Sequence, residues 1–302
     1  GVYFGFSDYA DLTLRSDLYT NGGGGVHSNS QYNRRYKYNG SFGVDYSRLL
    51  QGEIGFPDYA INKDFRLIWK HSQDAKAHPG TRFSADVDFV SRGYLKYNSY
   101  KPDDYLANTV SSAINYSKSV GRQSFVTNLG ITQYTAQKKV ILKLPEVSYS
   151  INTFNPFGSK TRKGKLRWYE NIRGGYSMNL RNDIDIPDTV LFKKLMQQDI
   201  ITNSISASTF ENFPNYYEDP IVWNRYMRNG VKHSIPFSTN LRVLNYFNLS
   251  PTLTLNDRWY LQTLSKSWNP TTNSIKIDTV NGFNRTFDFL FTTPLSAQLF
   301  GM

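Results

Sequence analysis

The chain has 302 residues and no Cys, carries a formal net charge of +11, and combines 39% hydrophobic with 16% aromatic residues. The missing Cys excludes disulfides and thiolate metal sites within the chain. A membrane-spanning helix is excluded too, because no run of about 18 apolar residues exists. Soluble domains draw their interior mainly from Leu, Ile, Val and Ala, whereas Tyr, Phe, Ser, Thr and Asn dominate here. Composition therefore fits a transmembrane β-barrel with aromatic girdles and a polar lumen, with a soluble all-β sandwich or propeller as the alternative.

The first residues already follow a strand-like pattern. Residues 2–6 read Val-Tyr-Phe-Gly-Phe, without a signal peptide, and we interpret the chain as an internal fragment of a longer protein. After this start, apolar and polar residues alternate over long stretches. In a strand this places the two kinds of side chain on opposite faces.

A clear example of this alternation runs from Lys165 to Arg181. Its apolar parity includes Trp168, Tyr176 and Met178, and Glu170 is an exception on that parity. Soluble strands usually have about five or six residues, whereas a tilted membrane strand needs about 9–11. The length of the pattern therefore favours a barrel wall.

The same reading along the chain predicts about 13 strands. We expect them at residues 1–6, 9–19, 25–36, 39–49, 62–72, 80–92, 106–119, 123–135, 139–153, 164–181, 232–244, 249–266 and 283–300. Bacterial single-chain barrels use even strand numbers. The odd count predicts that residues 1–302 form a partial transmembrane β-barrel domain, about 13 strands of a larger barrel.

Connections between the predicted strands alternate in length. Short links are expected at 7–9, 119–123 and 245–248, and longer ones at 51–61, 92–106 and 268–282. The longest loop, 184–232, contains a hint of a short helix at 189–198. Short periplasmic turns opposite long extracellular loops are typical of outer-membrane barrels.

Parity also predicts which side chains meet lipid and which meet the lumen. Phe42, Phe83, Trp259, Phe287 and Phe289 should face outward. The lumen-facing candidates are Arg82, Asp86, Asp88, Arg167, Arg173, Arg181, Arg242, Arg258 and Asp288. A charge at the middle of the lipid face would cost about 2–4 kcal/mol, so these residues have little choice of side.

No constellation for catalysis emerges from the sequence. The four His residues are His27, His71, His78 and His233, and none has the spacing of a zinc motif. Asp86 and Asp88 share a strand face, but Arg82 lies on it too, which favours an ion-paired lumen over a catalytic carboxylate pair. We predict neither enzymatic turnover nor a cofactor nor a catalytic metal. Because basic residues alternate with Asp, we expect no nucleic-acid partner.

Several segments are similar to members of the LPS-assembly protein family LptD, in its divergent branch with a large barrel. The similar segments are residues 3–12, 35–40, 69–74, 82–85, 144–146, 168–171, 230–236, 246–251 and 258–260. They extend over nearly the whole chain. Their motifs are structural, and it is their order that carries the resemblance.

The resemblance implies a function at the Gram-negative cell outer membrane. Family members receive lipopolysaccharide from periplasmic Lpt bridge proteins and insert it into the outer leaflet through a seam in the barrel, around an LptE-like plug lipoprotein. This chain would lack the preceding periplasmic jellyroll and the closing strands. The alternatives are a porin or a TonB-dependent-type outer-membrane transporter, and a soluble or surface-exposed all-β adhesin.

Overall fold

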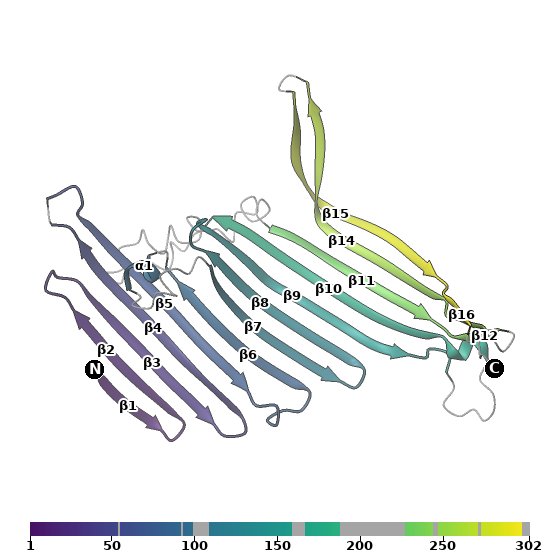
Figure 1. Cartoon of the computed structure of the whole chain (residues 1–302), viewed down its shortest axis with the longest axis horizontal. Coiled ribbons are helices and arrows are strands. Elements are labelled where there is room, and N and C mark those ends of the chain that lie inside the picture. The colour runs from purple at the N-terminus through teal and green to yellow at the C-terminus, as the bar shows by residue number, and fades with distance from the viewer. Residues whose placement is uncertain are drawn as a thin grey trace, which may run out of the picture. The chain divides into compact units, whose positions relative to one another are not determined.

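The computed structural model describes residues 1–53, 55–91, 93–98, 109–158, 167–187, 227–243, 247–270 and 273–297. Its main element is a 13-stranded antiparallel sheet in the order β1-β2-β3-β4-β5-β6-β7-β8-β9-β10-β11-β14-β15 (Figure 1). The prediction of an all-β antiparallel fold with about 13 strands is therefore confirmed. β1 and β15 end this order without pairing with each other, so the described sheet is not closed into a barrel.

The strands of the main sheet are mostly long. They are β1 (Val2–Ser7), β2 (Ala10–Leu18), β3 (Gly24–Arg34), β4 (Tyr38–Gln51), β5 (Ala60–Gln73), β6 (Thr81–Val90), β7 (Thr109–Val120), β8 (Gln123–Tyr134), β9 (Lys139–Phe154), β10 (Arg173–Pro187), β11 (Met227–Ser238), β14 (Thr252–Asn269) and β15 (Ser274–Thr292). A small second sheet contains β12 (Leu241–Val243), β13 (Phe247–Leu249) and β16 (Leu295–Ala297). The two described helices are α1 (Tyr94–Asn98) and the 3-10 helix η1 (Trp168–Asn171).

The chain divides into two compact units, and each contains parts of the main sheet. The first consists of residues 1–117, 128–144 and 183–227, and the second of residues 118–127, 145–182 and 228–302. In the first unit, consecutive strands from β1 to β6 lie side by side (Figure 1).

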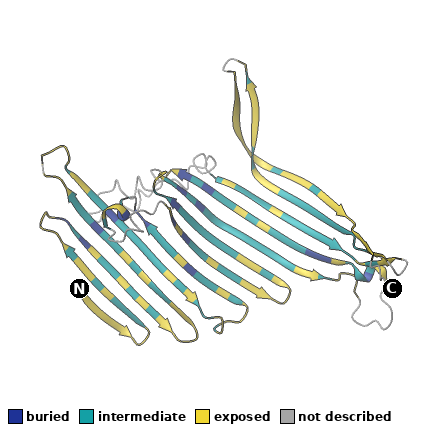
Figure 2. Ribbon diagram, viewed as in Figure 1, coloured by how far each residue is buried: buried dark blue, intermediate teal, exposed yellow. Residues whose placement is uncertain are grey.

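Few apolar side chains of the described residues are buried. One small cluster contains Val140, Leu142, Ile184 and Ile186, and another contains Val90, Tyr94, Leu95 and Val110. By contrast, Phe4, Phe289 and many other large hydrophobic residues are exposed. Figure 2 shows exposed residues along β1 and β15. Soluble monomers rarely display this much apolar surface.

Three predicted strands differ in the structure. The strand predicted at 283–300 contains the end of β15 and all of β16, which belong to different sheets. Residues 164–166 of the predicted strand 164–181 lie outside the described residues, and within the described part the strand begins at Arg173, because Trp168–Asn171 forms η1. Glu170 explains this: its carboxylate accepts a hydrogen bond from the Arg167 backbone N–H at 2.7 Å and closes a capping box. The predicted strand 232–244 is two strands, β11 and β12, which belong to different sheets.

The prediction of a loop at residues 268–282 is also wrong. β14 and β15 remain paired from Gln262↔Asn281 to Asn269↔Ser274, beyond Gly230↔Tyr260, where the pairing of β14 with β11 ends. We call residues 261–282 the hairpin arm (Figure 1). It begins at a β-bulge between Tyr260 and Gln262. The hinted helix at 189–198 lies outside the described residues.

Candidate functional site: the charged face of the sheet

Register gives each part of the sheet one apolar and one polar face. Directly paired residues of antiparallel strands point to the same side. The pairs Phe42↔Trp69 and Trp69↔Val87 place three apolar residues on one side of β4, β5 and β6. The pairs Asp45↔Arg66 and Lys70↔Asp86 lie on the other side. The alternation in neighbouring strands is thus in phase.

Ion pairs between neighbouring strands cover the polar face of β5 and β6. Arg66 donates to Asp88 twice, from Nε at 2.9 Å and from Nη2 at 2.7 Å. Lys70 lies 3.7 Å from Asp86, and both side chains are mostly exposed. An exposed pair of this kind contributes little to stability, whereas the two-pronged Arg66 contact also fixes geometry.

Helix α1 packs against this polar face. The Tyr94 hydroxyl donates to Asp45 at 3.0 Å, and burial, followed by the nearby Asp45 carboxylate, raises the pKa of Tyr94 above its ordinary range. His27 lies between two carboxylates, with Nδ1 2.9 Å from Asp45 and Nε2 3.1 Å from Asp17. An imidazole donates to both only when both nitrogens carry protons. A hollow of about 350 Å³ lies beside this network.

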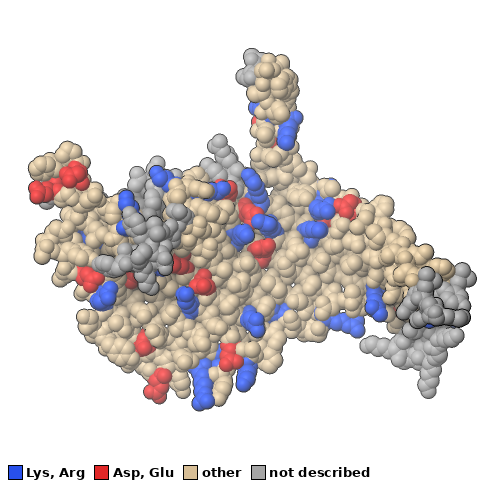
Figure 3. All heavy atoms as spheres, in the orientation of Figure 1, with Lys and Arg blue, Asp and Glu red and all other residues tan. Residues whose placement is uncertain are grey.

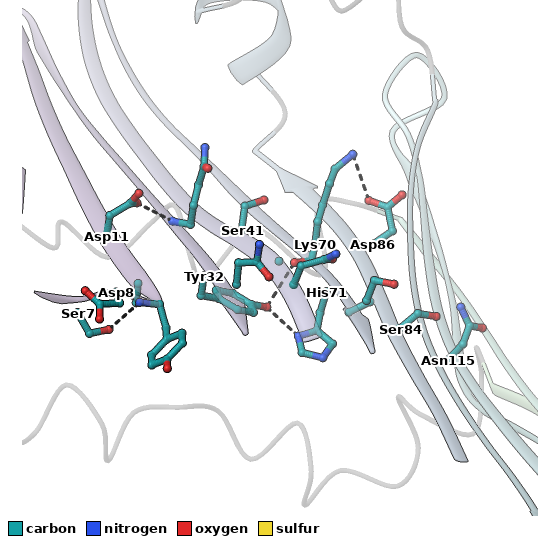
Figure 4. Close-up of a pocket in the computed structure, with 18 of the residues that line it drawn as sticks. Ser7, Asp8, Asp11, Tyr32, Ser41, Lys70, His71, Ser84, Asp86 and Asn115 are labelled. Atoms are coloured by element: carbon teal, nitrogen blue, oxygen red, sulfur yellow. Dashed lines mark hydrogen bonds and ion pairs between the residues drawn. The ribbon is translucent and has the colours of Figure 1, made fainter. Parts of the chain in front are cut away.

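Residues from strands β1 to β7 line a larger trough of about 790 Å³. Figure 4 shows that Asp11, Ser41, Lys70 and Asp86 are among its lining residues. Carboxylate, amide and hydroxyl groups dominate its labelled side chains. Such a surface binds hydrated or hydroxyl-rich groups better than acyl chains, because an apolar ligand would leave these polar groups unpaired.

The second unit repeats the two-faced arrangement on β11, β14 and β15. Arg258 forms an ion pair with Asp288, which also accepts a hydrogen bond from Asn256 Nδ2 at 2.8 Å. Lys232 is the cross-strand partner of Arg258 on the same face. Two sequence candidates, Arg258 and Asp288, therefore contact each other directly. In the first unit, charges of both signs lie close together at the upper ends of β9 and β10 (Figure 3), where Lys139 Nζ is 2.8 Å from Asp185 Oδ2.

The other candidates are distributed unevenly. Arg82 shares the polar parity of Asp86 and Asp88 on β6, and Arg173 and Arg181 share one parity of β10. For two candidates the predicted strand setting is wrong. Arg167 precedes η1 and donates to the Tyr169 hydroxyl at 2.8 Å. Arg242 lies on β12 of the small sheet.

The apolar faces carry rows of aromatic rings. In the first unit, His71 contacts Tyr32, Tyr38, Trp69 and Phe83, with ring centroids 5.2–6.2 Å apart. The Tyr32 hydroxyl lies 2.9 Å from His71 Nδ1 and accepts a hydrogen bond from Trp69 Nε1 at 2.9 Å. Aromatic side chains with a polar end suit the boundary between hydrocarbon and water.

In the second unit a row of five rings crosses the strands from β9 to β15. Its members are Tyr149, Tyr176, His233, Trp259 and Phe283, each within 4.4–6.1 Å of the next by ring centroid. We call these residues the aromatic row. The Tyr176 hydroxyl lies 2.8 Å from His233 Nδ1, so the row also contains a polar link.

Parity reasoning missed one charged pair. Asp257 and Arg285 lie on the apolar face of β14 and β15, with Arg285 Nη2 2.8 Å from Asp257 Oδ2. Their odd numbers, shared with Trp259, Phe287 and Phe289, were a signal in the sequence. The contact itself is diagonal, because Arg285 is the direct partner of Trp259.

Two absences concern only the part of the chain that the structure describes. In it, no group of three or more His, Cys, Asp or Glu residues is arranged to hold a metal ion. None of its helices is long and apolar enough to cross a membrane.

These features define an all-β protein whose large antiparallel sheet displays apolar residues on one face and charged pairs on the other. The sequence model described as LptD protein matches residues 1–302, so the chain belongs to the LptD family. The resemblance predicted from the ordered segments is confirmed. At the family level, this membership gives a role in lipopolysaccharide transport at the outer membrane. No curated protein matches the chain.

Proposed function

We propose that the sheet is part of the wall of an outer-membrane β-barrel that inserts lipopolysaccharide into the outer leaflet. The observation that carries the proposal is the two-faced sheet: exposed Phe287 and Phe289 lie on one side of β15, and the Arg258–Asp288 pair lies on the other. A wall between lipid and a watery lumen needs this distribution. Membership in the LptD family supports lipopolysaccharide as the cargo.

In this proposal the polar face lines the lumen. The trough beside Lys70 and Asp86 and the hollow under Tyr94 are then surfaces for hydrated saccharide or for an LptE-like plug lipoprotein. Periplasmic Lpt bridge proteins deliver the cargo. We also propose that the full-length protein contains further barrel strands and a periplasmic jellyroll.

The test places a photo-crosslinking amino acid in the full-length protein in cells, at Arg173 or Arg258 of the proposed lumen face. A matched position is Phe289 on the opposite face of β15. We expect adducts with lipopolysaccharide or a plug lipoprotein from the arginine positions, and none with the plug from Phe289. Adducts only with unrelated cargo, together with normal surface lipopolysaccharide after depletion of the protein, would favour a porin or transporter instead.

A further inference from the structure

A charged pair interrupts the apolar face of β11, β14 and β15. Along β14 this face presents Leu253, Leu255, Asp257 and Trp259, and along β15 it presents Phe287 and Arg285 among other residues. Asp257 is the direct cross-strand partner of His233 and of Phe287. The pair therefore lies among aromatic rings and not among the charges of the opposite face.

Asp257 holds the guanidinium of Arg285 in a fixed position. Arg285 Nε donates to the two carboxylate oxygens at 2.9 and 3.0 Å, and Nη2 lies 2.8 Å from Oδ2. The Asp257 side chain is 18% exposed, whereas the Arg285 side chain is 59% exposed. These contacts leave the Nη1 donors outside the pair, on a side chain open to its surroundings.

The Asp257–Arg285 pair lies at the same height along the strands as the aromatic row. Arg285 is the direct partner of Trp259, and Phe283 is the next residue of β15 on the same side. On β14, the bulge at Tyr260–Gln262, where the hairpin arm begins, follows Trp259 directly. Arg is costly inside hydrocarbon and tolerated at the headgroup level, where Trp and Tyr also gather. In the proposed function, this position corresponds to a membrane–water boundary.

We propose that Arg285, fixed by Asp257 and flanked by Trp259 and Phe283, binds the phosphate of a lipid headgroup on the outer face of the wall. The inference rests on the proposed function in one respect, that this apolar face meets lipid. Arg suits phosphate because its planar fork presents several donors to the anion at once. The proposed occupant is a membrane lipid whose acyl chains lie along Leu255, Phe287 and Phe289.

The experiment uses the purified full-length protein in detergent with added phosphatidylglycerol, or with diacylglycerol of the same acyl chains. Native mass spectrometry counts the retained lipid. Arg285→Gln should lower retention of phosphatidylglycerol about tenfold, the effect of losing roughly one charge-assisted contact, and should not change retention of diacylglycerol. Lys276→Gln is the matched control, because it removes an Asp-paired cation of the same strand, β15, from the hairpin arm. It should leave both unchanged.

A second variant protects the test from misfolding. Arg285→Gln leaves Asp257 without its partner, so the double variant Asp257→Asn/Arg285→Gln, which removes both charges, should show the same loss in a folded protein. Equal retention by wild type and both variants overturns the proposal. Displacement of the lipid by an equal concentration of inorganic phosphate also overturns it, because the site would then bind the ion alone.

A photo-crosslinker at Phe289 separates this proposal from the proposed function. Capture of both lipids by the wild type, with a loss of phosphatidylglycerol alone in Arg285→Gln, supports both. Capture of both lipids without any effect of Arg285→Gln overturns only the phosphate site. Capture of neither lipid overturns the lipid-facing assignment itself.

Discussion

Phe289 and Leu290 offer a direct test of whether the two faces of the sheet meet different solvents. They are neighbours on β15, and both are large, apolar and mostly exposed, at 67% and 59%. The register puts Phe289 on the face of Leu255 and Leu290 on the face of Thr254. Only the side of the sheet distinguishes their surroundings.

In a soluble protein, Lys at either position should change stability by no more than about 0.5 kcal/mol, because both side chains are already exposed. At the middle of a lipid-facing band the same substitution costs about 2–4 kcal/mol. We therefore expect Phe289→Lys to lower the free energy of unfolding by about 2–4 kcal/mol. This corresponds to a decrease of roughly 30- to 1000-fold in the equilibrium constant for folding. Leu290→Lys should fall within about 0.5 kcal/mol of wild type.

The free energy of unfolding is measured by urea titration of the full-length protein in lipid vesicles, under conditions in which unfolding is reversible. Each variant is also examined in detergent, where the micelle can adapt to the charge and the difference should shrink. Equal costs for Phe289→Lys and Leu290→Lys would refute the assignment of lipid to one face. A larger cost for Leu290→Lys would reverse it.

Three further predictions concern local structure. Gly40→Ala should destabilise the protein by about 1–3 kcal/mol in thermal unfolding, because a Cβ there would collide with the Tyr32 hydroxyl and the Lys70 carbonyl oxygen; no change would contradict the close packing of Tyr32 over β4. Glu170→Ala should cost about 1 kcal/mol by removing the cap of η1, whereas Glu170→Gln should retain most of it. Tyr94→Phe should speed proteolysis near α1 by breaking the bond to Asp45; unchanged cleavage would show that burial alone holds α1.

Alternation of apolar and polar residues was enough to predict the class of fold and the face of most residues. Phe42, Trp69 and Val87 meet on one side because each strand follows period two, and register then aligns the strands. Register was constrained in advance, since a slip by one residue would exchange all the side chains between the faces. The Arg258–Asp288 pair follows from the same logic.

Alternation could not predict where regular strand pairing stops. Residues 167–171 continue a period-two pattern, yet a carboxylate within reach of the Arg167 backbone N–H stabilises a 3-10 turn. The part of the hairpin arm beyond residue 266 was missed for the opposite reason. Residues 268–282 contain Pro, Gly, Asn and Thr, which favour a loop, although Trp268 and Asn269 pair with Ile275 and Ser274.

The bulge at the base of the hairpin arm gives separate support for the position of the membrane boundary. Below it, the odd-numbered residues of β14 include Leu253, Leu255 and Trp259, whereas above it they include Ser265 and Ser267. Beyond Leu261 the apolar residues of β14, Leu264 and Trp268, thus have even numbers, and the odd-numbered side that carries the proposed lipid-facing surface becomes polar. This change from apolar to polar side chains is expected if that side meets lipid below the bulge and water above it. Because the aromatic row and Arg285 lie just below the same bulge, side-chain polarity and ring placement support the same level of the sheet for the proposed membrane boundary.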